Sequence, residues 1–219
     1  LLHLLTVALL QGFTEFLPIS SSGHLVLAPR LMGWPDQGLT IDIAVHVGTL
    51  GAVMVYMWRD LWTMLRDVLR LATGRIGEGA RLAFYLVIAS IPVGLAGFLL
   101  KSQFEDGVRS AEIVAWAFVG FGILLYLSDR FGLTLRRMEH MSLGAALVIG
   151  IAQAFAIIPG ASRVGTTITG ARLMGMERRE AARFSMLLSV PAIVGAGLLQ
   201  GAELWQSGDA RLQWDAVMA

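Results

Sequence analysis

The sequence Gln11-Gly-Phe-Thr-Glu-Phe-Leu-Pro-Ile-Ser-Ser-Ser-Gly-His24 interrupts an otherwise apolar segment that runs from Leu1 to Met32. Pro18 cannot continue a helix, and the serines that follow it are polar. In a lipid environment such a break exposes backbone groups, and it is tolerated only where it lines a cavity enclosed by protein. The sequence therefore predicts two short helices that meet at a polar break.

A second apolar segment, Leu143–Leu173, is broken in the same way, at Pro159-Gly160 and at Ser162-Arg163. Its run Gln153-Ala-Phe-Ala-Ile-Ile-Pro159 is similar to Gln11-Gly-Phe-Thr-Glu-Phe-Leu-Pro18 when one gap is allowed. In both segments a Ser-containing polar stretch and a shorter helical piece follow. This order of elements predicts an internal repeat.

The composition is that of an integral membrane protein. Hydrophobic residues make up 56% of the chain and charged residues 15%, and the mean hydropathy is +0.68. Soluble domains carry about 25% charged residues. The chain has no cysteine, which excludes disulfides and thiolate metal sites, and its net charge of +1 gives no sign of a nucleic-acid partner. We expect an all-α, polytopic membrane protein with four unbroken spans at Ile41–Trp58, Leu82–Leu100, Ile113–Ser128 and Phe184–Leu204.

Three loops rich in arginine, 59–81, 129–141 and 172–183, are predicted to lie in the cytoplasm by the positive-inside rule. Two spans separate the first loop from the second, as this requires. Only the broken segment separates the second loop from the third, so we predict that this segment is a re-entrant hairpin. Three spans lie between the two broken segments, so the first hairpin enters from the opposite side. The alternative is a pair of ordinary kinked spans.

The chain is thus predicted to form one membrane domain, residues 1–219, built from inverted repeats at about residues 1–128 and 142–219. Inverted repeats with broken helices that meet near the bilayer midplane are one way to build a polar site inside a membrane. Three spans follow the first hairpin but only one follows the second, and the tail 206–219 is polar. We therefore expect a truncated second repeat and further membrane helices beyond Ala219.

The first break carries several groups suited to chemistry. Glu15 lies inside an apolar run, where a carboxylate is costly and indicates function, and Gln11 shares its helix face. His24, about one turn into the second half-helix, could hold a proton for a leaving group or activate a hydroxyl. The start of that half-helix offers free N–H groups that bind phosphate, and hydroxyls from Ser20, Ser21 and Ser22. The plainer alternatives are N-capping by the serines and a structural ion pair of Glu15 with an arginine.

The second break, Pro159-Gly-Ala-Ser-Arg-Val-Gly-Thr-Thr167, complements the first. Gly160 and Gly165 allow close approach of the backbone to a ligand. Arg163 offers a planar, permanently charged fork that suits phosphate oxygens. Its anionic partner is either a substrate phosphate or Glu15, and the sequence leaves both open. The remaining candidates for binding the substrate are the hydroxyls of Ser162, Thr166 and Thr167.

Together the two breaks predict an anion site in an apolar shell. A single carboxylate, Glu15, suits a diphosphate bridged by Mg²⁺, because Mg²⁺ commonly binds through one or two carboxylates and substrate phosphates. The same carboxylate could instead act as a base. A diphosphate head in an apolar shell implies a substrate with a lipid tail. His46, four residues after Asp42, is interpreted as a supporting or helix-contact residue rather than a reacting one.

At these two motifs the chain resembles the bacterial undecaprenyl-diphosphate phosphatases of the bacitracin-resistance type, over nearly its whole length. The resemblance implies a hydrolase of the bacterial inner membrane that converts undecaprenyl diphosphate to the monophosphate and inorganic phosphate. This recycles the lipid carrier for peptidoglycan synthesis and confers resistance to bacitracin. It also implies a need for Mg²⁺ or Ca²⁺, with Glu15 as metal ligand and Glu15, Ser21, His24 and Arg163 as catalytic residues.

Two positions depart from the family pattern: Gln11, where a carboxylate often stands, and Val164, where a serine is usual. They leave the number of metal ions open. The sequence also leaves open a homodimer and whether Ser21 is a covalent nucleophile. The rival function is a lipid-phosphate transporter, because inverted repeats around an anion site are common among transporters. A pure transporter needs no nucleophile, so it should tolerate Ser21→Ala.

Overall fold

The computed structural model describes residues 2–106 and 110–218, and within these ranges the chain is helical without any β-strand. Four helices are long and apolar enough to cross a membrane: α3 (Gly38–Tyr56), α5 (Glu78–Asp106), α6 (Ala111–Phe131) and α9 (Arg178–Ser207). Each contains or closely matches one of the four predicted spans. The prediction of an all-α polytopic membrane protein is confirmed.

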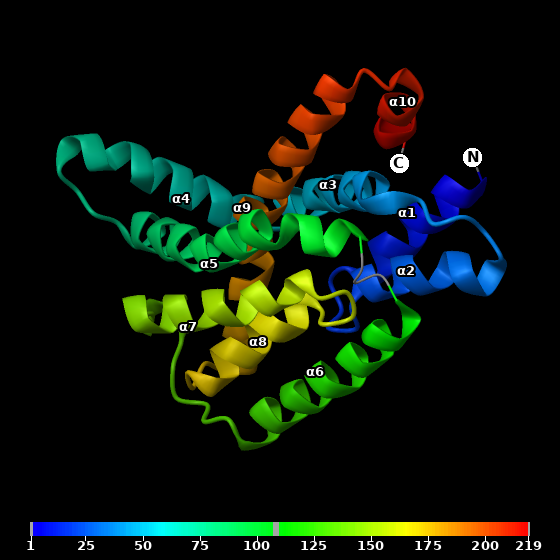
Figure 1. Ribbon diagram of the computed structural model, residues 1–219. Coiled ribbons are helices and arrows are strands. Elements are labelled where there is room, and N and C mark those ends of the chain that lie inside the picture. The colour runs from blue at the N-terminus through cyan, green and yellow to red at the C-terminus, as the bar shows by residue number, and fades with distance from the viewer. Residues whose placement is uncertain (1, 107–109, 219) are drawn as a thin grey trace.

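The two broken segments form two helical hairpins (Figure 1). The first consists of α1 (Leu2–Thr14) and α2 (Ser21–Met32), and the second of α7 (Leu143–Ala154), the 3₁₀ turn η3 (Phe155–Ile157) and α8 (Arg163–Leu173). The hairpins open in opposite directions and their broken tips meet at the centre of the molecule. The tips pack directly, since a Cβ atom on Gly23 would lie 3.2 Å from the Cα atom of Gly160. Their re-entrance into a bilayer stays a prediction.

The two hairpins correspond residue for residue, without the gap that we expected from the sequence. Gln11 and Gln153 lie 142 positions apart, as do the helix-capping residues Ser20 and Ser162. The same spacing relates Arg30-Leu31-Met32-Gly33 to Arg172-Leu173-Met174-Gly175, and both of these glycines have positive φ. The gap was wrong because it aligned the two prolines, which occupy different places in the two turns.

The region 59–81, predicted to be a loop, is mostly helical. It contains α4 (Trp58–Arg70) and the 3₁₀ turn η1 (Leu71–Thr73), and α5 begins at Glu78. Apolar residues recur along α4 at helical spacing, for example Leu61, Met64 and Val68, and this period was hidden among the arginines. The polar tail likewise contains a short helix, α10 (Ala210–Met218). A 3₁₀ turn, η2 (Met138–His140), lies in the loop before α7.

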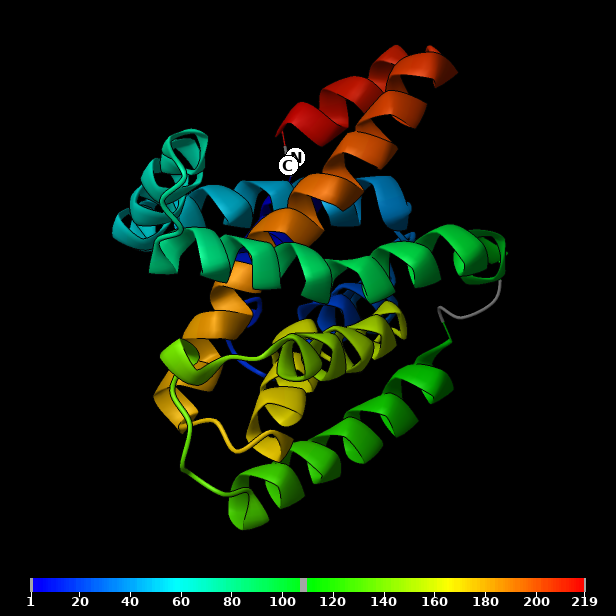
Figure 2. The same ribbon diagram turned by 90° about the vertical axis from the view of Figure 1, so that its left-hand side faces the viewer.

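The main core lies where α5, α7, α8 and α9 pack together, and α9 runs obliquely across the bundle (Figure 2). Ala89, Ile149, Phe184 and Leu187 are completely buried there. A smaller cluster joins α1, α2 and α3 through Val7, Leu25 and Val45. The hairpin tips also pack against α6, since Cβ atoms on Gly23 and Gly160 would meet Phe118 and Val114.

The close contact between α5 and α7 depends on Gly150, because a Cβ atom at this position would lie 2.5 Å from the carbonyl oxygen of Ala89. Small residues allow this kind of approach between membrane helices. We expect Gly150→Ala to destabilise the protein by about 1–3 kcal/mol, since the added methyl group forces the two backbones apart. Thermal unfolding in detergent measures the effect.

The control is Gly144→Ala on the same helix, where a Cβ atom would meet nothing within 4 Å. That substitution should leave the melting temperature unchanged or raise it, because alanine favours the helix over glycine. Equal melting temperatures for the two variants would contradict the packing argument.

Candidate functional site

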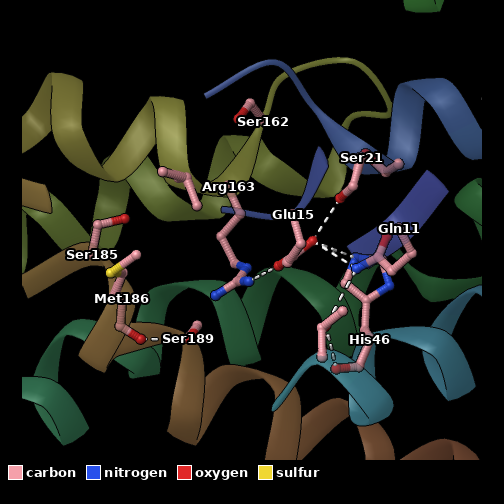
Figure 3. Close-up of polar contacts among 12 residues, drawn as sticks. Gln11, Glu15, Ser21, His46, Ser162, Arg163, Ser185, Met186 and Ser189 are labelled. Atoms are coloured by element: carbon pink, nitrogen blue, oxygen red, sulfur yellow. Dashed lines mark hydrogen bonds and ion pairs between the residues drawn. The ribbon is translucent and has the colours of Figure 1, made fainter. Parts of the chain in front are cut away.

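The carboxylate of Glu15 is the centre of a polar cluster at the meeting point of the hairpin tips (Figure 3). Its Oε2 atom accepts hydrogen bonds from Ser21 Oγ at 2.6 Å and from Gln11 Nε2 at 2.8 Å. Its Oε1 atom is paired with Arg163 Nη2. Glu15 is only 5% exposed, so a negative charge there depends on these partners. The structure therefore brings together Glu15, Ser21, Gln11 and Arg163 from the two motifs.

Two serines with unusual backbone geometry stand directly before two polar side chains of this cluster. Ser20 has φ 60° and Ser162 has φ 55°, in the left-handed region that residues other than glycine seldom adopt. Their side chains cap the following half-helices by accepting from Gly23 N and Gly165 N, at 3.3 and 3.1 Å. Each sharp turn is followed at once by a side chain that contacts Glu15, Ser21 in α2 and Arg163 in α8.

A cavity of about 220 Å³ opens beside this cluster. Its polar end is formed by Glu15, Ser21, Ser22, Ser162 and Arg163. The remaining walls are mostly apolar, from Ile43, Val93, Ala156, Ile157, Val164, Ala192, Ile193 and Ala196. A cavity with charge and hydroxyls at one end and aliphatic walls elsewhere suits a phosphorylated lipid.

His46 of α3 belongs to this site, although its sequence position gave it only a supporting role. Its Nε2 atom lies 3.3 Å from Glu15 Oε2, and its side chain lines the cavity. No motif contains it, because α3 reaches Glu15 only through the tertiary packing of α1 against α3. Its spacing of four residues from Asp42 was the available signal, and that spacing alone indicates no function.

Several predicted residues lie away from the cavity. His24 Nδ1 lies 2.8 Å from the carbonyl oxygen of Ser20, and its ring packs edge-on against Phe118. Thr166 and Thr167 donate to the carbonyl oxygen of Arg163, and Thr167 also bonds to Ser185. Gly160 packs against α6, and Ser20 acts as a cap. Roles for these residues in binding or catalysis stay predictions.

The carboxylate of Glu15 and the amide oxygen of Gln11 are the kind of ligands that a hard divalent cation uses when substrate phosphates supply the other ligands. Gln11 Oε1 is buried and has no hydrogen-bond partner within the described ranges, although Gln11 lies against Glu15. Over the same ranges no group of three or more His, Asp or Glu side chains is placed to hold a metal by itself. Mg²⁺ can bind through few carboxylates and complete its shell with phosphate oxygens and water, so its binding beside Glu15 stays a prediction.

Comparisons with known proteins find one matching family and several similar sequences. A family model described as "Bacitracin resistance protein BacA" matches residues 4–219. A protein of Ruegeria pomeroyi named "Undecaprenyl-diphosphatase" is 50% identical, over 100% of this chain and 83% of that protein. "Undecaprenyl-diphosphatase 1" of Rhodospirillum rubrum is 47% identical over 100% of this chain and 80% of its own length. The "Undecaprenyl-diphosphatase" of Hahella chejuensis is also 47% identical, over 99% of this chain and 81% of its own length.

Proposed function

This chain belongs to the bacitracin resistance protein BacA family, and from that membership we propose that it hydrolyses undecaprenyl diphosphate to undecaprenyl phosphate and inorganic phosphate in the bacterial inner membrane. The observation that carries the proposal is the convergence of Ser21 and Arg163 on Glu15 at two half-helix N-termini. The identity of about 50% over the whole chain supports the same substrate. Such a reaction returns the lipid carrier to peptidoglycan synthesis and confers resistance to bacitracin.

The diphosphate enters the polar end of the cavity, and the isoprenyl chain lies along the aliphatic walls. Arg163 binds the phosphates through its Nη1 atom, which is buried and without a hydrogen-bond partner in the described part of the chain. The free N–H groups at the starts of α2 and α8 add further donors. These groups stabilise the negative charge that develops on the transferring phosphoryl group.

Ser21 is the nucleophile in this proposal, because its hydroxyl donates to Glu15 Oε2 over 2.6 Å. Ser21 Oγ forms a bond to the terminal phosphorus while its proton passes to Glu15. The bond from that phosphorus to the bridging oxygen breaks, and undecaprenyl phosphate leaves with the electron pair. Water then attacks the phosphoserine, inorganic phosphate leaves, and Ser21 regains its proton.

We further propose that Glu15, together with Gln11 Oε1, holds Mg²⁺ or Ca²⁺ with the substrate phosphates. The ion supplies Lewis-acid neutralisation of the phosphate charge when bound. Because so few protein ligands are available, we expect removal of divalent cations with EDTA to abolish phosphate release, and added Mg²⁺ to restore it. The protein should remain folded in EDTA, since its cores do not involve the ion.

The experiment that tests the function measures phosphate release by the purified protein in detergent, with C55 isoprenyl diphosphate as substrate. Release by the wild type and its loss in Ser21→Ala would support hydrolysis. Transbilayer movement of the lipid in vesicles, unaffected by Ser21→Ala and without phosphate release, would instead establish the transporter. Phosphate trapped on Ser21 would support the covalent step, and incorporation of solvent oxygen with no trapped intermediate would contradict it.

A further inference from the structure

His46 has both of its ring nitrogens directed at acceptor atoms. Nδ1 lies 2.6 Å from the carbonyl oxygen of Asp42, and Nε2 lies 3.3 Å from Glu15 Oε2 (Figure 3). A carbonyl oxygen only accepts hydrogen bonds, so Nδ1 carries a hydrogen and donates it. The contact at Nε2 therefore holds a proton between the imidazole and the carboxylate. This fixes the orientation of the ring with respect to Glu15.

The helix that carries His46 is itself held in place at this level. Gln37 Nε2 donates to the Asp42 carboxylate over 2.6 Å, and Thr49 Oγ1 donates to the carbonyl oxygen of His46. Val45 and Val53 of the same helix are buried in the two cores. His46 thus approaches Glu15 from a rigid element, whereas Glu15 itself lies in the turn between two half-helices.

The carboxylate of Glu15 has a competing arrangement. Arg163 now uses Nη2 to contact Oε1, while its Nη1 atom is buried and has no partner among the described residues. Rotation of the carboxylate would let the guanidinium bind both oxygens, which is a favoured geometry for arginine with a carboxylate. In that arrangement Oε2 turns away from Ser21, and Arg163 is occupied.

We propose that His46 is a positioning residue for the hydrolysis. It holds Oε2 of Glu15 against Ser21 and prevents a bidentate ion pair between Glu15 and Arg163. The inference rests on the proposed function, since it gives Glu15 its role as acceptor of the Ser21 proton. Gln11 Nε2 also donates to Oε2 of Glu15, but Gln11 belongs to the same hairpin as Glu15. His46 is the contact that ties this oxygen to a separate spanning helix.

The test compares His46→Leu with His46→Gln, whose amide nitrogen can replace Nε2 as a donor. For His46→Leu we expect kcat to fall about tenfold to a hundredfold while KM changes less than about threefold, because ground-state binding of the lipid is retained. His46→Gln should recover most of the lost kcat. His140→Gln, at an exposed turn, is the control and should behave as wild type.

Infrared spectroscopy provides a readout that needs no turnover. The carboxylate stretching band of Glu15, identified by its loss in Glu15→Gln, should shift in His46→Leu and return towards its wild-type position in His46→Gln. An unshifted band, wild-type kcat in His46→Leu, or equal kcat losses in both variants would overturn the proposal. Absence of phosphate release from the wild type would refute the function itself, while the infrared arm would still test the contact.

Discussion

Glu15→Gln is expected to lower kcat/KM for phosphate release by about a thousandfold or more. The substitution keeps the shape of the side chain but removes the negative charge and the basicity of the carboxylate. Ser21, His46 and Arg163 all contact this carboxylate. Loss of a proton acceptor at the nucleophile costs about a hundredfold to ten-thousandfold, and the loss of charge also leaves Arg163 without its buried counter-ion. Steady-state phosphate release measures the effect.

The control for this prediction is Glu112→Gln, which changes an exposed carboxylate in the first turn of α6 and should retain activity. Both variants should elute as folded protein in detergent. A Glu15→Gln variant with more than about a tenth of the wild-type rate would remove Glu15 from the chemistry, because a lost general base is not compensated to that extent.

Arg172→Met is expected to destabilise the folded protein more than any other single substitution considered for this chain. Arg172 is 1% exposed and lies at the end of α8. Its guanidinium donates to the carbonyl oxygens of Asp129, Gly132, Leu133 and Met176 and to the hydroxyl of Thr134. Its Nε atom is also 3.3 Å from Asp129 Oδ1. One side chain thus satisfies carbonyl groups that helix C-termini leave unpaired.

Methionine fills much of the same space but donates nothing, so these carbonyl groups lose their shared hydrogen-bond donor together. Losing several hydrogen bonds from one buried charged donor costs about 3–5 kcal/mol, which corresponds to a fall in melting temperature of about 10 °C for a chain of this length. Arg172→Lys should be nearly as unstable, because a lysine has no planar fork to reach several acceptors. Thermal unfolding in detergent measures both variants.

Arg178→Met serves as the control, since Arg178 contacts the same carboxylate, Asp129, over 2.6 Å but has an exposed side chain. Exposed ion pairs contribute little, so its melting temperature should stay near that of the wild type. If Arg172→Met and Arg178→Met unfolded at the same temperature, the network around Arg172 would not be what anchors α8 to the end of α6.

The elements that the sequence predicted well are those set by local composition. The spans are long apolar runs, and the breaks at Pro18 and at Pro159-Gly160 follow from the restricted backbone of proline and the polarity of the residues beside them. Glu15, Ser21 and Arg163 stood out because polar groups are expensive within apolar segments. The structure places these three side chains in one cluster.

The sequence was less informative where the outcome depends on how helices meet. His46 lies 31 positions from Glu15, and only the packing of α3 against α1 brings the two together. The orientation of His24 depends on Phe118 of α6, which lies much further along the chain. Helix α4 was missed because its charges were read as those of a loop. For His46 and His24 the neighbouring helix could not be known from the sequence, and in α4 the helical period was obscured by the charged residues.

Because the two hairpins match residue for residue, each polar group around Glu15 can be compared with its counterpart in the other hairpin. Ser21 and Arg163 occupy equivalent places, each directly after a capping serine, yet one side chain is a hydroxyl and the other a guanidinium. Glu15 has Ile157 as its counterpart, so the carboxylate exists in one half only. A symmetric scaffold offers two identical positions, whereas phosphoryl transfer needs two different groups there. In the proposed mechanism the reaction therefore depends on specialisation of the halves, because neither hairpin contains all of the groups that the mechanism uses.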